Sequence, residues 1–352
     1  MNILIAHERF LFRFGVDRVM IELINQFNQL GHSITLITYR IILPAIQSLT
    51  NKINIIPVIN KTNLEQNSLD YLTSNWTKIS INQYDVVLIG GWPFCSSIPF
   101  FKSQGLLVVV SDHGIPNEDV PFFNYYRVLR DTYFNYSDKI IGVSQYVSKQ
   151  LDHSNYSVIH NGGDHLRTPF WKKRDLPMFL PVIPYLSYLS RQHKILLLGR
   201  WNITNYKNSD SIFRILSHLL KITKDFVIFV CEDKRKINIP IEFQPYLIPI
   251  GYPDDQELLS LIRSVDVGLS VSLWEGFNLP LLETQWEHKP VMCFNKGAHP
   301  EIVQNTNSLC SSEQELVDKL LHLDLLSIPR SNWTSMFIWA NTAQYYLDEI
   351  QR

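Results

Sequence analysis

Two glutamates with seven residues between them could bind a hydroxyl-rich ligand. Glu275 and Glu283 stand in the segment Ser272-Leu-Trp-Glu-Gly-Phe-Asn-Leu-Pro-Leu-Leu-Glu283. Asn278 is a residue type that caps helix N-termini, and Pro280 suits the first helical turn, where a missing N–H costs little. The segment therefore predicts a turn that carries one acid and opens a helix that carries the other.

The start of that helix is also a candidate phosphate site. Backbone N–H groups at a helix N-terminus attract anions, and here they would be those of Phe277, Asn278 and Leu279. Two acids beside a phosphate site suit a nucleotide sugar, which carries both hydroxyl and phosphate groups. The alternative is an ordinary capped surface helix with two solvated acids.

A second group of residues could supply positive charge. Leu196-Leu-Leu-Gly-Arg-Trp201 reads as a strand that ends in Gly-Arg, and Lys207 follows at an expected helix start. Arg200 offers a planar fork of donors and Lys207 a compact charge, so together they could hold a departing diphosphate. The alternative is that both are solvated surface cations.

Two further turns stand in the first half of the chain. Gly15, in Phe14-Gly-Val-Asp-Arg18, would let the backbone approach phosphates closely, while Arg18 could bind phosphate or serve the fold. His113, in Ser111-Asp-His-Gly114, follows an apolar strand at the edge where parallel sheets bind ligands. No G-x-G-x-x-G follows the first strand, which argues against a dinucleotide oxidoreductase.

Apolar, β-branched runs alternate with amphipathic stretches along the chain, the pattern of parallel sheets covered by helices. The expected helices are Arg18–Leu30, ended by Gly31, then Ser144–Leu151, capped by Ser144, and finally Trp333–Arg352. The expected strands are Ile3–Ala6, Ile34–Thr38, Val86–Gly90, Leu106–Ser111, Lys139–Val143, Tyr156–His160, Ile195–Leu198, Phe226–Val230, Tyr246–Pro249, Val267–Val271 and Val291–Phe294.

A proline-rich and aromatic passage, residues 168–193, interrupts this alternation. The simplest division is therefore into two successive α/β domains, 1–165 and 166–330, with a terminal helical segment at 331–352. The extra residues of the passage could form a lid or a short helix on the first domain.

Composition excludes several classes of protein. With 352 residues, 45% of them hydrophobic and 18% charged, the chain is long and apolar enough for two folded domains. A formal net charge of -1 argues against nucleic-acid binding as the main function. The four cysteines form no C-x-x-C pair, and neither a signal peptide nor about 20 uninterrupted apolar residues can be found, so we expect free thiols and a cytoplasmic protein.

The acidic segment resembles the E-x7-E signature of retaining glycosyltransferases of family 4 (glycosyltransferase group 1), which have the GT-B fold. The resemblance implies two Rossmann-like domains that face each other across a cleft, with a C-terminal helix that crosses back to the first domain. Trp333 and Trp339 resemble the anchors of that crossing. The matching landmarks run from Gly15 to Glu301, in the Lys296-Gly-Ala-His-Pro-Glu301 turn, and so cover most of the chain.

The resemblance also implies roles for single residues. Glu275 would lie at the donor sugar, with Arg200 and Lys207 at the diphosphate and His113 as the cleft histidine that contacts the sugar. Donor binding would further involve Gly15 and the segment of Gly276, Phe277, Asn278, Leu279 and Glu283, with Glu283 on the ribose.

The sequence departs from the family pattern at several of these landmarks. Asn278 and Asn208 each stand where the family commonly has Gly. The Gly15 turn has lost one glycine. Phe229-Val-Cys-Glu-Asp233 replaces a Gly-x-Gly loop beside the nucleotide base, so the base cannot be read from it.

These features lead to the expectation of an enzyme that moves a hexose from a nucleotide-diphosphate sugar, UDP-glucose before GDP-mannose, to a saccharide or lipid-linked acceptor. No metal or other cofactor is expected, because fixed cations can replace Mg²⁺ at the diphosphate. The alternatives are an epimerase or phosphorylase of the same fold and a catalytically silent nucleotide-sugar-binding module.

Two aromatic and basic stretches, residues 9–14 and 122–130, leave a further choice open. Their aromatic side chains could pack into the core, which is the favoured interpretation. The alternative is peripheral contact with a lipid-linked acceptor or with the inner face of a membrane.

Overall fold

The computed structural model describes residues 1–352 apart from 12–13, 50–52, 59–62, 81–82, 118–119, 168–192, 202–205, 324–325, 327 and 330. Two compact units result, one made of Met1–Lys172 with Phe337–Arg352 and the other of Lys173–Met336. The sequence placed the divisions after residues 165 and 330. Almost all of the proline-rich passage lies outside the described residues, as does Arg13.

The first unit is built on a parallel sheet, seven-stranded in the described residues, with the order β5-β3-β1-β6-β7-β8-β9. A short parallel pair, β2 (Arg9–Phe10) with β4 (Arg40–Ile41), lies outside it. The strands of the main sheet are β5 (Ile53–Pro57), β3 (Ser33–Thr38), β1 (Asn2–Ala6), β6 (Val86–Ile89), β7 (Leu107–Asp112), β8 (Lys139–Gly142) and β9 (Tyr156–Val158).

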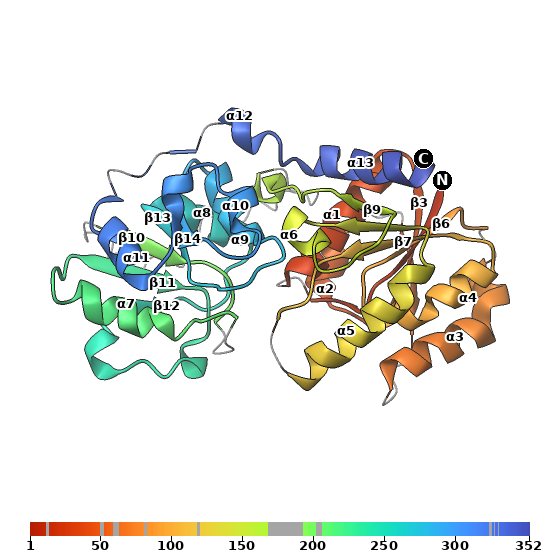
Figure 1. Cartoon of the computed structure of the whole chain (residues 1–352), viewed down its shortest axis with the longest axis horizontal. Helices are drawn as coiled ribbons and strands as arrows, with labels where there is room; N and C mark the ends of the chain where they lie inside the picture. Colours follow the sequence, from red (N-terminus) through yellow and green to blue (C-terminus); the bar gives the residue numbers. More distant parts are fainter. Residues whose placement is uncertain are drawn as a thin grey trace. The chain divides into compact units, whose positions relative to one another are not determined.

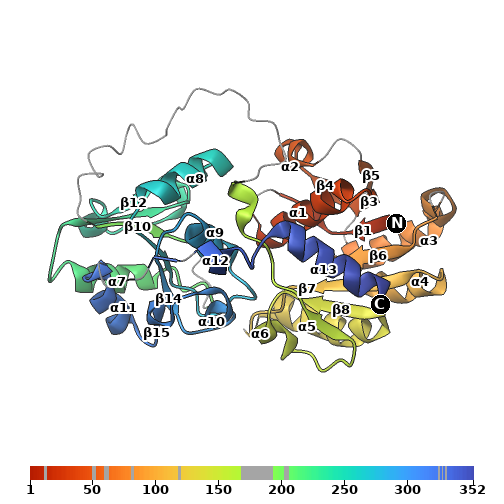
Figure 2. The ribbon, with the colours of Figure 1, turned by 90° about the horizontal axis from the view of Figure 1, so that it is seen from above.

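Helices cover both faces of this sheet because its strands are apolar on both sides (Figures 1 and 2). Leu4 and Ala6 belong to one core cluster, which includes residues of α3 (Leu64–Ile79) and α4 (Ile98–Ser103). The alternate residues Ile3 and Ile5 are equally buried on the opposite face. The remaining helices of the unit are α1 (Gly15–Gln29), α2 (Leu43–Ser48), α5 (Pro121–Tyr133), α6 (Gln145–Ser148) and α13 (Trp339–Gln351).

The last helix of the chain, α13, belongs to the first unit and packs against α1 and β8. Trp339 anchors its start, since the side chain is 1% exposed and its backbone N–H donates to Asp164 Oδ1 at 2.9 Å. The expected single helix Trp333–Arg352 is wrong in one respect, because α12 (Ser331–Thr334) and α13 are separate. Trp333 lies in the second unit, where α12 packs against α9 (Leu279–Trp286).

The second unit contains a second parallel sheet, with the order β12-β11-β10-β13-β14-β15. Its strands are β12 (Leu247–Pro249), β11 (Phe226–Val230), β10 (His193–Leu197), β13 (Val267–Ser270), β14 (Val291–Phe294) and β15 (Leu309–Cys310). Besides α9 and α12, its helices are α7 (Ser211–Leu219), α8 (Asp255–Ser264), α10 (His299–Ile302) and α11 (Glu313–Leu320).

Helix α9 packs unusually close to the second sheet. A Cβ atom added to Gly268, in β13, would lie 2.9 Å from Thr284 Cγ2 of α9. This close packing fixes α9 behind the strand whose carboxyl end leads into the acidic segment. On the other face, α7 and α11 close the core over residues such as Ile195 and Leu269.

Each expected strand is present, with ends that agree to within two residues. The sequence missed β5 and the short β2, β4 and β15. The expected helix Arg18–Leu30 begins earlier, at Gly15, and is followed by Gly31 with φ 86° as the expected stop. The helix expected at Ser144–Leu151 is shorter, but Ser144 does cap it by accepting from the N–H of Val147. All four cysteines are free, as expected.

The strand orders locate the two edges where ligands bind in open parallel sheets. In such sheets the binding crevice lies at the carboxyl ends of the two strands at which the strand order reverses. That point lies between β1 and β6 in the first unit and between β10 and β13 in the second. The loops after β10 and β13 are those that carry Arg200, Lys207 and Glu275.

Candidate active site

The loops after β10 and β13 bring Lys207 and Glu275 into direct contact. Lys207 Nζ donates to Glu275 Oε1 at 2.6 Å, and the two side chains are 15% and 13% exposed. The sequence predicted both residues as site residues but did not pair them. A cation and an acid therefore meet at the reversal point of the second sheet, and solvent still reaches both.

Backbone pairing between the two loops fixes this contact. The Leu273 N–H donates to the Tyr206 carbonyl at 2.8 Å, and Asn208 Nδ2 donates to the Val271 carbonyl at 3.1 Å. Asn208 has a left-handed backbone with φ 51°. Glycine adopts this conformation most easily and asparagine is among the next best, so Asn208 keeps the turn that a glycine would make.

A third loop, after β14, supports Glu275 from behind. The Ala298 N–H donates to the Glu275 carbonyl at 3.0 Å. A Cβ atom added to Gly297, which has φ 60°, would lie 2.7 Å from both the N and the O atoms of Glu275. Only glycine fits this left-handed and crowded position without a shift of the Glu275 backbone.

Asn278 does not act as the sequence predicted. It occupies the N-cap position of α9, but its side chain accepts no helix N–H. Its backbone is left-handed, with φ 82°, so the side chain points elsewhere: Nδ2 donates to Ser270 Oγ at 3.1 Å and lies 2.9 Å from His299 Nε2. Pro280 does stand in the first turn, as expected.

His299 is a site residue that the sequence analysis missed. It starts α10, is 0% exposed, and lies with Nδ1 2.8 Å from the Phe294 carbonyl oxygen. The signal was available, since His299 stands in the turn Lys296-Gly-Ala-His-Pro-Glu301, which follows a strand of the same sheet. The sequence analysis used that turn only as a landmark of the family resemblance.

Charges around Glu275 keep it ionised. Burial alone would raise the pKa of this carboxyl, but the charge and hydrogen bond of Lys207, helped by His299 and Ser272, hold its pKa below the ordinary value. Burial also lowers the pKa of His299, against the opposing charge of Glu275. At neutral pH the pair is therefore a carboxylate beside an ammonium, with an uncharged imidazole behind it.

Glu283 and Arg200 lie at the same edge of the second sheet. Glu283, in α9, is 8% exposed, and its charge acts on the thiol of Cys231 just after β11. Burial first, and the charges of Glu283 and Glu232 next, raise the pKa of Cys231 to about 12. Arg200 is exposed and follows Gly199, which has φ 88° and turns the chain out of β10.

The turn between the two glutamates is held in the core. Gly276 and the side chains of Phe277 and Leu279 are buried, with Phe277 at 5% exposure. The structure thus brings Glu275, Gly276, Phe277, Asn278, Leu279 and Glu283 together with Lys207 at one sheet edge.

The other two predicted residues belong to the first unit. Gly15 is the first residue of α1, and a Cβ atom added there would meet nothing within 4 Å. The space beside it is open, but no left-handed backbone demands a glycine. Arg18 is 8% exposed and bonds Glu22 within the helix at 3.4 Å, which favours the structural interpretation.

His113 follows β7 and is tied to the C-terminal helix. Its Nε2 lies 3.1 Å from Ser111 Oγ, which lies 2.9 Å from the Tyr346 hydroxyl of α13. Burial lowers the pKa of His113 to about 4, so the imidazole is uncharged at neutral pH. A neutral imidazole can hydrogen-bond a sugar hydroxyl without adding charge.

The neighbouring Asp112 is structural. Its carboxylate accepts from the fully buried Arg130, from the Tyr156 hydroxyl at 2.7 Å and from the Gly114 N–H at 3.0 Å. These donors fix the turn that carries His113. The sequence also missed His7, which follows β1 and bonds Asp17 at 3.1 Å.

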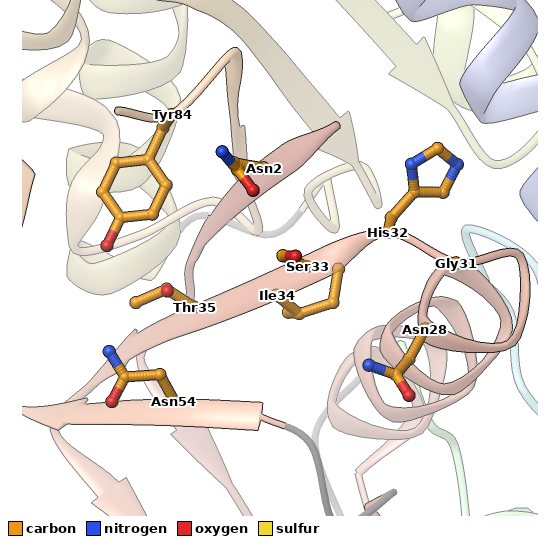
Figure 3. Close-up of a pocket in the computed structure, with 9 residues that line it drawn as sticks. All are labelled: Asn2, Asn28, Gly31, His32, Ser33, Ile34, Thr35, Asn54 and Tyr84. Atoms are coloured by element: carbon orange, nitrogen blue, oxygen red, sulfur yellow. The ribbon is translucent and has the colours of Figure 1, made fainter. Parts of the chain in front are cut away.

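A pocket of about 500 Å³ lies at the opposite edge of the first sheet. Its wall is formed by the beginnings of β1 and β3 and the residues around them, as Figure 3 shows. Asn2, Ser33, Asn54 and Tyr84 belong to this wall. Because ligands of parallel sheets bind at carboxyl ends, this polar hollow is separate from the candidate site.

Metal binding and membrane spanning are two further functions to consider. Among the described residues, no group of three or more His, Cys, Asp or Glu side chains could hold a metal ion. No helix in that part of the chain is both long and apolar enough to cross a bilayer.

Two family profiles together cover most of the chain. Residues 15–167 match the profile described as Glycosyltransferase Family 4, and residues 192–324 match Glycosyl transferases group 1. No match was found among curated proteins.

Solved structures share the fold over the whole chain at low sequence identity. A glycosyltransferase from Rickettsia africae ESF-5 is 19% identical, with a TM-score of 0.76 over 99% of this chain and 98% of that one. Sucrose-phosphate synthase from Thermosynechococcus elongatus is 11% identical, with a TM-score of 0.75 over 100% and 98%. HepE of Anabaena in complex with UDP-glucose is 12% identical, with a TM-score of 0.71 over 99% and 96%.

The two profiles and the shared fold together identify the family. The chain belongs to the family 4, group 1 glycosyltransferases, and its two Rossmann-like units are those of the GT-B fold.

Proposed function

We propose that this protein is a retaining hexosyltransferase that uses a nucleotide-diphosphate sugar, with the donor held by the second unit. The observation that carries the proposal is the contact between Lys207 and Glu275 at the reversal point of the second sheet. A phosphate-binding cation and a sugar-binding acid are there held together by three loops. Family membership supplies the reaction class, and this geometry supplies the residues.

Lys207 can serve the diphosphate without releasing Glu275. An ammonium group has three N–H donors, and the structure uses one of them on Glu275 Oε1. The remaining donors, with the exposed Arg200 at the same edge, can neutralise the charge that builds on the leaving phosphate. Glu283 takes the ribose hydroxyls in this proposal.

The transfer itself breaks the bond between the anomeric carbon and the diphosphate oxygen. An acceptor hydroxyl attacks the same face of the sugar, and the departing phosphate oxygen takes its proton. The carboxylate of Glu275 orients the sugar and stabilises the positive charge that develops on the ring. His113, neutral at pH 7, binds a sugar hydroxyl in the same scheme.

No metal takes part in this scheme, because Lys207 and Arg200 meet the charge that Mg²⁺ would otherwise meet. Turnover should therefore persist in excess EDTA. A requirement for a divalent ion would contradict this part of the proposal.

UDP-glucose is the favoured donor, before GDP-mannose. Supporting this choice, HepE, which has the same fold over nearly the whole chain, binds UDP-glucose in its solved structure. The acceptor is a saccharide or a lipid-linked saccharide, which the proposal assigns to the first unit, in the synthesis of a polysaccharide or glycolipid.

A thermal-shift panel of UDP-glucose, GDP-mannose and ADP-glucose tests the donor. A ligand that binds only the native state raises the melting temperature in proportion to its binding. We expect the largest shift with UDP-glucose, and a clear loss of it in Lys207→Met. Lys221→Met removes an exposed lysine after α7 and should keep the shift. Equal shifts in both variants would contradict the site.

Activity assays test the assigned roles. Glu275→Ala and Lys207→Ala should keep the fold, as judged by circular dichroism, but lose turnover. Turnover near the wild-type level in both variants would refute these assignments.

A peripheral membrane site on α5 extends the proposal. Phe122, Tyr125 and Val128 are spaced three apart on this helix and are 51%, 50% and 63% exposed. Apolar side chains on one helix face suit a lipid interface. Cosedimentation with anionic liposomes should weaken when Arg9, Arg13 and Arg127 are neutralised, and no binding at low salt would end this idea.

The same extension places the protein in the cytoplasm, at the inner face of the membrane. Its four free cysteines favour a reducing compartment. Fractionation of cells that express the chain should find it in the cytoplasm and, where α5 binds lipid, also with inner membranes.

A further inference from the structure

Both N–H groups of the Asn278 amide are used inside the second unit. Its two N–H groups point to Ser270 Oγ at 3.1 Å and to His299 Nε2 at 2.9 Å. All three residues are buried, with Asn278 at 8% exposure and the other two at 0%. The side chain of Asn278 thus connects the end of β13 to the start of α10 beneath the Glu275 turn.

These contacts determine which nitrogen of His299 carries the proton. The Phe294 carbonyl can only accept, so Nδ1, at 2.8 Å, must donate to it. The amide nitrogen of Asn278 can only donate, so Nε2 must accept. The imidazole is consequently neutral, and its one lone pair is occupied.

His299 lies close enough to Glu275 for the carboxylate charge to act on the protonation of the imidazole. Burial lowers the pKa of His299, the Glu275 charge raises it, and the Lys207 charge lowers it again. The adjacent Ala298 N–H donates to the Glu275 carbonyl, so α10 begins directly behind the Glu275 backbone. A proton on His299 would place a second positive charge beside this carboxylate.

We propose that Asn278 and His299 are positioning residues, in which the Asn278 amide keeps the His299 imidazole uncharged and thereby leaves Lys207 as the cation paired with Glu275. The inference rests on the proposed function of Glu275. Each further cation beside a carboxylate weakens its stabilisation of a positively charged sugar, so Glu275 works best with Lys207 as its one cationic neighbour among these residues. Asn278 therefore does more than replace a glycine in a left-handed turn.

Two substitutions at Asn278 separate this role from a purely structural one. Asn278→Asp keeps the size of the side chain and its tolerance of φ 82°. Its carboxylate can only accept a hydrogen bond, so His299 must carry a proton on Nε2 to donate to it. Asn278→Gly keeps the left-handed backbone and removes the donor. Both variants should raise the pKa of His299, and the aspartate should raise it more.

The first readout needs no substrate. In ¹⁵N-histidine-labelled protein, with His299→Gln used to assign the signal, NMR should show Nδ1 protonated and Nε2 unprotonated at pH 7. In Asn278→Asp the pKa of His299 should rise by at least about 1, and Nε2 should gain its proton. A doubly protonated His299 in the wild type would overturn the proposal.

The second readout is the pH profile of turnover. Asn278→Asp should lose about tenfold in kcat at pH 7 and regain part of it at higher pH, as His299 loses its proton. Asn278→Gly should move the acidic limb of the profile to higher pH. A purely structural role would give a different result. Both variants would then melt at a lower temperature, but the pKa of His299 and the pH profile of turnover would stay as in the wild type.

The two readouts also distinguish this inference from the proposed function. If NMR shows the expected protonation but no nucleotide sugar is turned over, the proposed function fails and the assignment of His299 stands. If turnover is present while the wild-type His299 is charged, the inference fails and the proposed function stands.

Discussion

Both units hold an acid and a cation at the carboxyl edge of a parallel sheet, yet the two pairs differ in exposure and in how many donors the acid already accepts from. Glu275 and Lys207 are 13% and 15% exposed. Asp112 and Arg130 are 1% and 2% exposed, and Asp112 also accepts from Tyr156 and from the Gly114 N–H. Solvent reaches the first pair, so it can meet a ligand, whereas the second pair is sealed from solvent and its carboxylate already accepts from three donors.

This difference shows why position at the sheet edge is not enough to identify a reactive acid. Asp112 ends β7 and Glu275 lies in the loop after β13, and binding residues of such sheets stand at these carboxyl ends. What separates them is access, because solvent reaches Glu275 and Lys207 but not Asp112 and Arg130. The Asp112 pair instead fixes the turn that presents His113.

The largest expected effect is on catalysis at Glu275. Glu275→Gln keeps the shape but removes the charge that would stabilise the sugar, so kcat should fall by about 10³-fold. The melting temperature should change little by comparison. The exposed Glu242→Gln, in the same unit, is the control and should keep full activity. If kcat of Glu275→Gln fell by less than fivefold, Glu275 would be no more catalytic than Asp112, and the contrast between the two acids would fail.

Breaking the other pair should cost stability. Arg130→Met leaves the Asp112 carboxylate buried without its cation, and we expect a loss of about 3–5 kcal/mol in the free energy of unfolding. The thermal shift caused by UDP-glucose should remain in the fraction that is folded. Denaturant titration measures the loss. Full stability with donor binding abolished would mean that the roles of the two pairs are reversed.

Two glycines give a matched pair of smaller effects. Gly297→Ala places a Cβ atom 2.7 Å from the Glu275 backbone at φ 60°, so kcat should fall by about tenfold with a loss of about 1–3 kcal/mol in stability. Gly15→Ala meets open space in α1 and should not destabilise the fold. If the donor phosphates approach Gly15, the Gly15→Ala variant should have a higher KM for the donor and an unchanged kcat. Steady-state kinetics and thermal melts distinguish these results.

The smallest effect is a pH dependence of stability. The fold lowers the pKa values of His299 and Glu275, so the native state binds fewer protons than the unfolded state. The free energy of unfolding therefore decreases as the pH is lowered. The His299 contribution begins to disappear below 6.5, and that of Glu275 below 4.5. We expect a loss of about 1–3 kcal/mol between pH 7 and pH 4.

Denaturant melts across this range measure the pH dependence, and His299→Gln should flatten its upper part. A stability that rises on acidification would contradict the assigned charge states.

The sequence predicted most of the fold because apolar runs mark buried parallel strands directly. It missed β5, whose residues are only partly buried, and the two-residue strands, whose patterns are too short to be seen. It joined α12 to α13 because both segments contain helix-compatible residues, while tertiary packing assigns them to different units.

The sequence predicted several residues of the candidate site, but it did not predict which of them contact one another. Glu275 and Lys207 were recognised, but their pairing depends on loops 68 positions apart in sequence. Asn278 was predicted as a cap because its residue type favours caps, and the left-handed φ that redirects its side chain cannot be read from a single residue. His299 was overlooked for the same reason, since its role depends on Asn278 and Glu275 in space.

The most direct test of the central claim is release of UDP from UDP-glucose by the purified protein, measured with and without the charge at Glu275. We predict slow hydrolysis by the wild type that is lost in Glu275→Gln and kept in Glu242→Gln. No release by the wild type despite tight donor binding, or equal release by all three proteins, would contradict the assignment of the Lys207–Glu275 contact as the catalytic centre.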